Sequence, residues 1–168
     1  MGTELLLQDA EGLAVVSGLW DEARDPGSAH RFAHRFALRV YYEDTDSGGV
    51  VYYANYLKFA ERARSEMMRL LGVGYDAMVA AGEIAFAVRH CAVDYFSPAR
   101  LGDVLVIETR IVELSGAVLC GQQKIMRQDE MLARLEVKLA CLNSAGRPVR
   151  IPAPVAEALT PFLQHQQD

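Results

Sequence analysis

Two kinds of hydrophobic periodicity meet in the stretch Arg39-Val-Tyr-Tyr-Glu-Asp-Thr-Asp-Ser-Gly-Gly-Val-Val-Tyr-Tyr-Ala-Asn-Tyr56. Before and into it, apolar residues alternate with others at the period of a strand: Phe36, Leu38, Val40 and Tyr42. The alternation stops at the acidic run 43–46, and Ser47-Gly48-Gly49 supplies a turn with two residues that tolerate positive φ. From Tyr56 to Gly72 the apolar residues follow one helical stripe. The stretch therefore predicts a strand, an acidic loop and a long amphipathic helix of about residues 54–71, with Phe59, Ala63 and Met67 toward a sheet.

Downstream of the helix, period-two patterns predict four strands at roughly 84–96, 104–114, 117–128 and 131–143. Short links between them favour antiparallel neighbours. A helical turn is expected at 76–81, and apolar residues in the tail predict a short terminal helix after Pro152 or Pro154. One long helix with a single apolar stripe needs a sheet to cover it, which predicts an α+β fold.

Length and composition narrow the classes of protein further. A chain of 168 residues with 51% hydrophobic residues fits one compact domain. The net charge of −5 and the scattered Lys and Arg argue against nucleic-acid binding, and no apolar run reaches the length of a membrane span. Residues 1–30 lack a signal-peptide pattern. Cys91, Cys120 and Cys141 lie in apolar strand patterns, so we expect buried reduced thiols and a cytoplasmic location.

Residues 39–56, continuing into Ala60-Glu-Arg-Ala-Arg-Ser-Glu66, closely resemble the hotdog-fold acyl-CoA thioesterases of the 4-hydroxybenzoyl-CoA thioesterase type, and most of all the branch associated with the Tol–Pal system. The block from Phe86 through Tyr95-Phe-Ser-Pro-Ala-Arg-Leu-Gly-Asp103 fits the same branch. The resemblance implies a five-stranded antiparallel sheet wrapped around the central helix. It also implies subunits that join their sheets into a homodimer or homotetramer.

The resemblance gives a hotdog domain at 34–143, preceded by an extension of unknown structure at 1–33 and followed by a tail at 144–168. Within the domain, Asp46 occupies the family's catalytic carboxylate position. A carboxylate can attack a thioester carbonyl or activate water. The residues alone favour a loop or cap residue that accepts backbone N–H groups, and the resemblance favours catalysis. We interpret Asp44, two residues earlier, as structural.

The backbone N–H of Tyr53, at the presumed helix start, is implied by the resemblance to be the oxyanion donor, since unpaired N–H groups there polarise oxygen. The Tol–Pal-associated branch often carries His at this position, whereas the aromatic-acyl enzymes carry Tyr. Glu61 is the alternative base, because a neighbouring thioesterase type places its carboxylate on this helix; a solvated or ion-paired helix residue is the simpler reading. Asn55 is predicted to cap the helix or to orient the loop.

Substrate binding is assigned to five residues and a neighbouring histidine: Gly49, Val50, Arg89, Ser97, Arg100 and His90. The basic members are candidates for the phosphates of coenzyme A, and ordinary surface charge is their competing interpretation. His, Cys and acidic residues show no metal-ligand spacing, so no metal is predicted. Coenzyme A belongs to the substrate, and no separate cofactor is expected.

The predicted function is hydrolysis of an acyl-CoA to a carboxylic acid and free CoA. The alternative from another class is a non-catalytic binder of acyl-CoA or acyl-carrier protein with the same fold. A hotdog dehydratase is a third reading, disfavoured because no paired His and carboxylate stand at suitable positions. Acyl-carrier protein is a further candidate partner.

Overall fold

The computed structural model describes residues 16–21 and 32–163. Its strands are β1 (Val16–Asp21), β2 (Phe32–Arg39), β3 (Ala85–Tyr95), β4 (Val104–Ser115), β5 (Val118–Arg127) and β6 (Glu130–Leu142). Its α-helices are α1 (Asn55–Leu70), α2 (Tyr75–Ala80) and α3 (Ala153–Leu159), and 3-10 turns cover Tyr42–Asp44 and Thr160–Phe162. No helix in the described ranges is long and apolar enough to cross a membrane.

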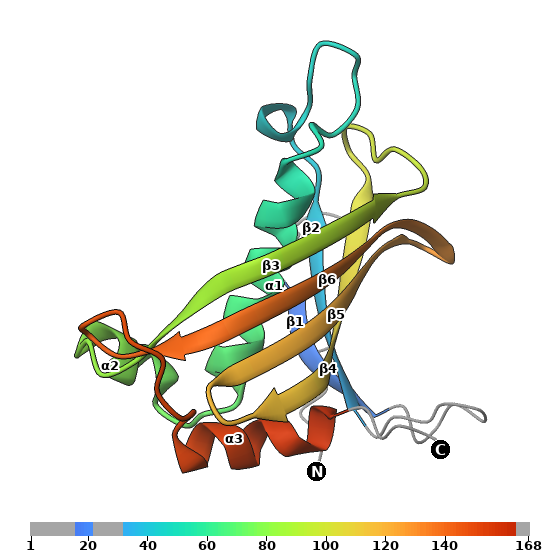
Figure 1. Ribbon diagram of the computed structural model, residues 1–168. Helices are drawn as coiled ribbons and strands as arrows, with labels where there is room; N and C mark the ends of the chain where they lie inside the picture. Colours follow the sequence, from blue (N-terminus) through green and yellow to red (C-terminus); the bar gives the residue numbers. More distant parts are fainter. Residues whose placement is uncertain (1–15, 22–31, 164–168) are drawn as a thin grey trace.

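All strands belong to one antiparallel sheet in the order β1-β2-β4-β5-β6-β3 (Figure 1). The five predicted strands and the central helix are confirmed. The sheet also has a strand that was not predicted, β1, which lies within the extension 1–33. It pairs with β2, and Val16 lies opposite Ala37. The two edges of the sheet are therefore β1 and β3. The boundaries of the predicted domain itself stay a prediction.

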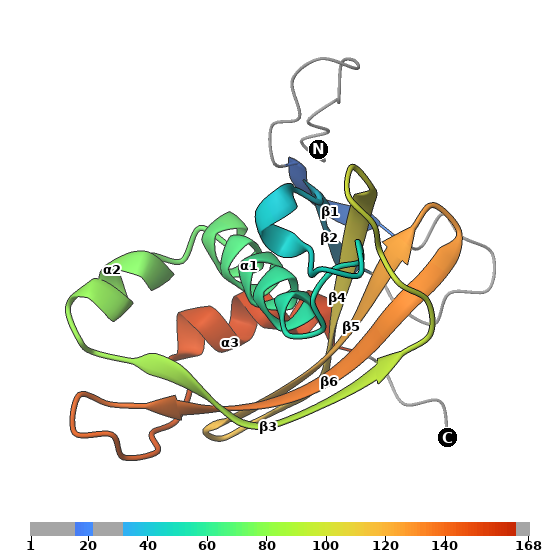
Figure 2. The same cartoon turned by 90° about the horizontal axis from the view of Figure 1, so that it is seen from above.

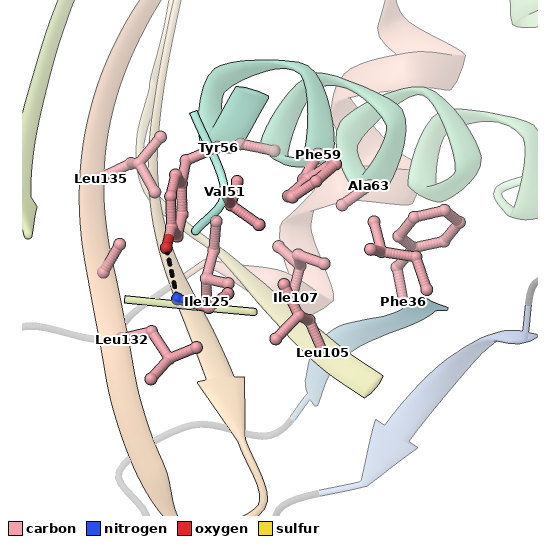
Figure 3. Packing of buried hydrophobic residues seen from close by; sticks show 14 of the residues in the cluster. Phe36, Val51, Tyr56, Phe59, Ala63, Leu105, Ile107, Ile125, Leu132 and Leu135 are labelled. Carbon is pink, nitrogen blue, oxygen red and sulfur yellow. Dashed lines mark hydrogen bonds between the residues drawn. The ribbon is translucent and has the colours of Figure 1, made fainter. Parts of the chain in front are cut away.

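The sheet curves around α1, which lies on its concave side with α2 and α3 toward one end (Figure 2). The predicted stripe is confirmed, because Phe59, Ala63 and Met67 are 1%, 0% and 2% exposed. α1 contributes Tyr56, Phe59 and Ala63 to a cluster with inward residues of β2, β4, β5 and β6 (Figure 3). The stripe is buried because successive turns present it to the sheet, while charged residues between occupy the outer face.

β3 carries a β-bulge at Arg89. Val88 pairs with Leu139 and His90 with Lys138, so Arg89 has no opposite residue on β6. The extra residue shifts the alternation of the strand. Phe86 and Val88 face α1 before the bulge, and Cys91 and Val93 face it afterwards. The bulge thus keeps apolar side chains on the helical side along the whole strand.

Three expectations are wrong. Tyr42 is 82% exposed, because β2 ends at Arg39 and the chain enters the 3-10 turn before Tyr42 can continue the inward face. Cys91 is exposed, since it lies on the edge strand β3 beside an open groove between that strand and α1, and Cys120 is only half-buried, whereas Cys141 is buried. Asn55 does not cap α1: the N-cap residue is Ala54, and the Asn55 amide is directed elsewhere.

Candidate active site

Two loops meet at the N-terminal end of α1, and together they form what we call the loop end, residues 40–54 and 96–103 (Figure 1). Backbone hydrogen bonds join them: Val51 N–H donates to Ala99 O at 2.9 Å, and Gly102 N–H donates to Val40 O at 3.0 Å. Val50 and Arg100 form an isolated antiparallel bridge. The sequence places these loops far apart, and the sheet brings them side by side.

Asp46 stands at the tip of the first loop with an exposed side chain. Its backbone N–H donates to Val50 O at 2.9 Å, and its Oδ1 accepts the Gly48 N–H at 2.8 Å. Gly49 has φ +73°, which closes the turn in the left-handed region. The carboxylate is therefore fixed by its own turn and open to solvent. Both readings of Asp46, loop acceptor and reactive carboxylate, are compatible with this geometry.

Asp44 ties the same loop to its surroundings. The side chain is buried, and its Oδ2 accepts the Tyr41 N–H at 2.8 Å. Its carbonyl oxygen accepts the Tyr52 N–H at 2.9 Å and the Asn55 amide at 2.9 Å. Asn55 therefore orients the loop from the first turn of the helix, which was the second of its two predicted roles. The helix start and the carboxylate loop form one connected unit.

Tyr53 precedes the N-cap residue of α1 and its side chain is 61% exposed. Its carbonyl oxygen accepts the Tyr95 hydroxyl at 2.9 Å, which fixes the peptide. Within the described part of the chain, no acceptor lies within hydrogen-bond distance of its N–H. The donor is thus available at the positive end of a sixteen-residue helix. Burial, first of all, raises the pKa of Tyr95, so this hydroxyl stays protonated as a donor.

Tyr56 links α1 to the second loop, residues 96–103, through a buried hydrogen bond. Its hydroxyl accepts the Ala99 N–H at 2.9 Å inside the core (dashed line in Figure 3). Its ring meets that of Tyr95 edge-on at 5.4 Å between centroids. Burial raises the pKa of Tyr56, with smaller opposing effects from the Ala99 N–H and Arg127. A neutral phenol therefore connects α1 to the loop end.

The fold places the predicted substrate-binding residues in two separate regions. Gly49, Val50, Ser97 and Arg100 all belong to the loop end. Arg100 is exposed, and its N–H donates to Asp103 Oδ2 at 2.8 Å. Although partial burial alone would raise it, the Arg100 N–H and the Arg127 guanidinium lower the pKa of Asp103 overall. Asp103 therefore remains an anion that anchors the loop.

Arg89 and Glu61 lie away from the loop end of their own chain. Arg89 is six residues before Tyr95 on β3, which corresponds to about 20 Å along the strand. Glu61 is six residues beyond Asn55, about 9 Å along the helix, and its Oε1 accepts the Ser65 hydroxyl at 2.8 Å.

A cavity of ≈ 120 Å³ lies beneath the second half of α1, and the sequence did not predict it. Apolar residues of α1, α2, α3 and four strands form most of its wall, and its polar members are Glu61, Arg64, Ser65 and Thr109. Arg64 Nη1 donates to Gln123 Oε1 at 2.6 Å. Gln123 Nε2 donates to Ala60 O at 2.9 Å and to Thr109 Oγ1 at 3.0 Å. The available signal was a polar residue at an inward strand position, as at Thr109 and Gln123.

Metal chemistry finds no support in the described ranges, where no three His, Cys, Asp or Glu side chains gather into a ligand set. The oxygen donors of the loop end are occupied by backbone N–H groups and by arginine, as at Asp44 and Asp103. The site therefore offers the exposed Asp46 carboxylate on a loop that is hydrogen-bonded to the start of α1. A carboxylate can attack, or direct water onto, a carbonyl, and a helix N-terminus can hold the resulting oxyanion.

A sequence profile of the thioesterase superfamily matches residues 48–134, more than half of the chain. The chain belongs to the thioesterase superfamily. This thioesterase is 44% identical over 124 residues to a Haemophilus influenzae protein named acyl-CoA thioesterase YbgC, covering 73% of this chain and 91% of that protein. The resemblance seen in the sequence is thereby confirmed.

Solved structures agree with this membership of the thioesterase superfamily. A probable thioesterase from Bartonella henselae has 40% identity and a TM-score of 0.64, covering 71% of this chain and 98% of the other. A 1,4-dihydroxy-2-naphthoyl-CoA thioesterase from Synechocystis has a TM-score of 0.71 at 24% identity, covering 76% and 96%, and it supports the fold alone. The hotdog arrangement of sheet and helix is thus shared with thioesterases.

Proposed function

We propose that this thioesterase hydrolyses an acyl-CoA, with Asp46 as nucleophile or general base and the Tyr53 N–H as oxyanion donor. One observation carries the proposal: the exposed Asp46 carboxylate belongs to a loop that is hydrogen-bonded to the start of α1, where the Tyr53 N–H is available. The family membership supports thioester hydrolysis, and the name of the Haemophilus relative supports acyl-CoA as substrate class.

The proposed chemistry uses two features of the loop end. The Gly48 N–H holds Asp46 Oδ1, so the carboxylate presents a fixed edge to the thioester. Attack by the carboxylate gives an acyl–aspartyl anhydride that water then opens; the general-base route delivers water directly. In both routes, charge develops on the carbonyl oxygen, and the Tyr53 N–H with the helix dipole stabilises it. The leaving CoA thiolate takes its proton from water.

The functional unit is proposed to be a dimer, or a dimer of dimers, whose sheets join at β3. This strand forms one edge of the sheet, is eleven residues long and leaves most side chains exposed. An unpaired edge of that length favours pairing with a second strand. Arg89 lies on this edge strand, six residues before Tyr95 and away from the loop end of its own chain, so in the dimer we assign it to the CoA phosphates of the partner's site, alongside Arg100.

The cellular location and the further partners of the protein are also part of the proposal. The three cysteines are free, which fits the reducing cytoplasm in which we place the protein. The proposed partners are the acyl-CoA substrate and a second copy of the chain. The links to acyl-carrier protein and to the Tol–Pal system stay predictions.

The test is a panel of acyl-CoA substrates assayed with a thiol reagent. Asp46→Asn keeps the size of the side chain but removes its charge and most of its basicity, so kcat should fall by roughly 10²–10⁴-fold. Binding of a non-hydrolysable acyl-CoA should change little. Glu61→Gln, the matched carboxylate control on α1, should lower kcat by less than about tenfold.

Full activity of Asp46→Asn would refute the assignment of Asp46. An inactive Glu61→Gln with an active Asp46→Asn would transfer the role to the helix carboxylate. Tight binding of acyl-CoA without release of thiol from any member of the panel would identify the non-catalytic binder instead.

A further inference from the structure

The cavity beneath α1 combines mostly apolar walls with two charged side chains, the cation Arg64 and the carboxylate Glu61 at the side shared with the groove. Met67, Phe86, Ile111 and Leu119 are among its apolar residues, and Arg64 projects among them. Burial lowers the pKa of Arg64, and the nearby Glu61 charge opposes that effect. A guanidinium remains protonated under such a shift, so the cavity contains a partly desolvated positive charge.

The charge is only partly satisfied by the protein. Gln123 Oε1 accepts one hydrogen bond from Arg64 Nη1 at 2.6 Å, whereas a guanidinium carries five N–H donors. Among the residues that the structure describes, none places a carboxylate within salt-bridge distance of Arg64. The Glu61 charge acts on Arg64 without forming an ion pair with it, and Glu61 Oε1 accepts the Ser65 hydroxyl at 2.8 Å. Desolvated charges in proteins are normally paired, so this arrangement calls for an anion.

Gln123 fixes where that anion would sit. Its Nε2 donates to both Ala60 O and Thr109 Oγ1, and these two acceptors determine which way the amide faces. Oε1 is then directed at Arg64, and Arg64 is held at one Nη atom. The remaining donors keep the planar fork that binds a carboxylate in a bidentate manner. Gln123 itself is 0% exposed, so the support is rigid.

The size and access of the cavity fit the far end of an acyl group. A cavity of about 150 Å³ accommodates benzene, so ≈ 120 Å³ has room for roughly five non-hydrogen atoms. It adjoins an open groove of ≈ 510 Å³ between α1 and β3, and Glu61, Arg64, Val88 and Val137 line both. The groove starts at Leu57, in the first turn of α1, so an acyl chain has a path from the surface to Arg64.

We infer that Arg64 is a specificity-determining residue that binds a carboxylate at the distal end of the acyl group, so that dicarboxylic acyl-CoA thioesters are preferred over neutral ones. The inference rests on the proposed function and names its substrate class. Arg64 binds the carboxylate of the ligand, and Gln123 positions Arg64. The apolar wall packs against the methylenes between the carboxylate and the thioester.

Binding of non-hydrolysable thioethers tests the inference without turnover. S-(4-carboxybutyl)-CoA and S-pentyl-CoA share one alkyl length and differ in the terminal carboxylate; a second pair, with three more methylenes in each, allows for a longer path to Arg64. By calorimetry, the better-fitting carboxylate analogue should bind at least about tenfold more tightly than its neutral partner. Arg64→Met should abolish that ratio. Arg69→Met, on the exposed face of the same helix, should keep it.

Gln123→Glu provides a second variant in case Arg64→Met fails to fold. It places an anion against Arg64 inside the protein, so the preference for carboxylate analogues should fall with little change in side-chain size. Equal binding of both analogues at both lengths by the wild type, or a preference that survives Arg64→Met, would overturn the inference.

Turnover separates this inference from the proposed function. Glutaryl-CoA and pentanoyl-CoA, together with the longer pair suberyl-CoA and octanoyl-CoA, corrected for spontaneous hydrolysis, should show the same preference in kcat/KM at the length that fits. Equal rates of hydrolysis within both pairs, with equal binding of their analogues, would remove the role of Arg64 and leave the thioesterase intact. A binding preference without hydrolysis of any acyl-CoA would keep the role of Arg64 and refute the proposed hydrolysis.

Discussion

The loop end and the cavity beneath α1 are built in opposite ways. At the loop end, the Asp46 carboxylate is exposed and is held by the Gly48 N–H of its own turn. Beneath α1, the polar groups of Arg64, Gln123 and Thr109 come from three different elements and are wholly or partly buried. The difference teaches that the proposed reactive carboxylate is a local feature of this fold, whereas the proposed selectivity depends on long-range packing.

If that contrast holds, stability should depend on the helix–sheet interface and hardly at all on the reactive loop. Ala63→Asp places a carboxylate at a position that is 0% exposed, so the free energy of unfolding should fall by about 4 kcal/mol or more. Asp46→Asn, at an exposed loop tip, should change it by less than about 1 kcal/mol. Urea unfolding of both variants measures the two values. Similar losses in both would break the contrast.

A buried histidine next to the polar layer makes the stability of the interior depend on pH. His34, opposite Thr109 on β4, is 0% exposed, and burial lowers its pKa to about 4 from the ordinary value of 6.5. Since the folded pKa lies below the unfolded one, the stabilisation is complete above pH 6.5 and is lost as pH falls toward 4. The loss should reach about 3 kcal/mol.

The measurement is urea unfolding at several pH values between 7.5 and 4.2, in wild type and His34→Gln. Carboxylates also titrate near the acid end, so the quantity of interest is the difference between the two slopes. Parallel slopes from pH 6.5 to 4.5 would show that His34 does not carry the effect.

Sequence reasoning reached as far as the local patterns allowed. Residues 39–56 contain their own turn chemistry and the change from period two to a helical stripe, so the strand, loop and helix were all predictable. Tyr42 was misplaced because no residue pattern marks the 3-10 turn that ends β2 early. Gln123 stands in the polar run Gln122-Gln123-Lys124, and only the packing of β5 against β4 and α1 reveals its partners Thr109 and Ala60.

Loss of a proposed contact with the CoA phosphates should have an intermediate effect, because such contacts are exposed to solvent and screened by salt. Arg100→Ala should raise KM by roughly three- to tenfold with little change in kcat, and the gap from wild type should narrow at high salt. Arg147→Ala, an exposed arginine in the turn after β6, is the matched control and should leave KM unchanged. A salt-independent rise in KM would assign Arg100 a structural role instead.

The smallest expected effect belongs to the side chain of Tyr53. Tyr53→Phe removes the hydroxyl but keeps the ring and the backbone N–H, so kcat should stay within about twofold of wild type. Steady-state assays with one substrate of the panel suffice. A loss of more than about tenfold would mean that the hydroxyl, and not the peptide, acts in the reaction.

Because of the bulge at Arg89, β3 can lose one residue at that position without a change in which side chains face α1. Removing Arg89 would leave Val88, His90 and Cys91 in strict alternation, so every apolar side chain would keep its face toward α1. Removing a residue two positions later would turn Val93 outward and a polar neighbour inward. Deletions at residue 89 should therefore be silent for the core, and length variation among descendants of this chain would be tolerated there and almost nowhere else in the strand.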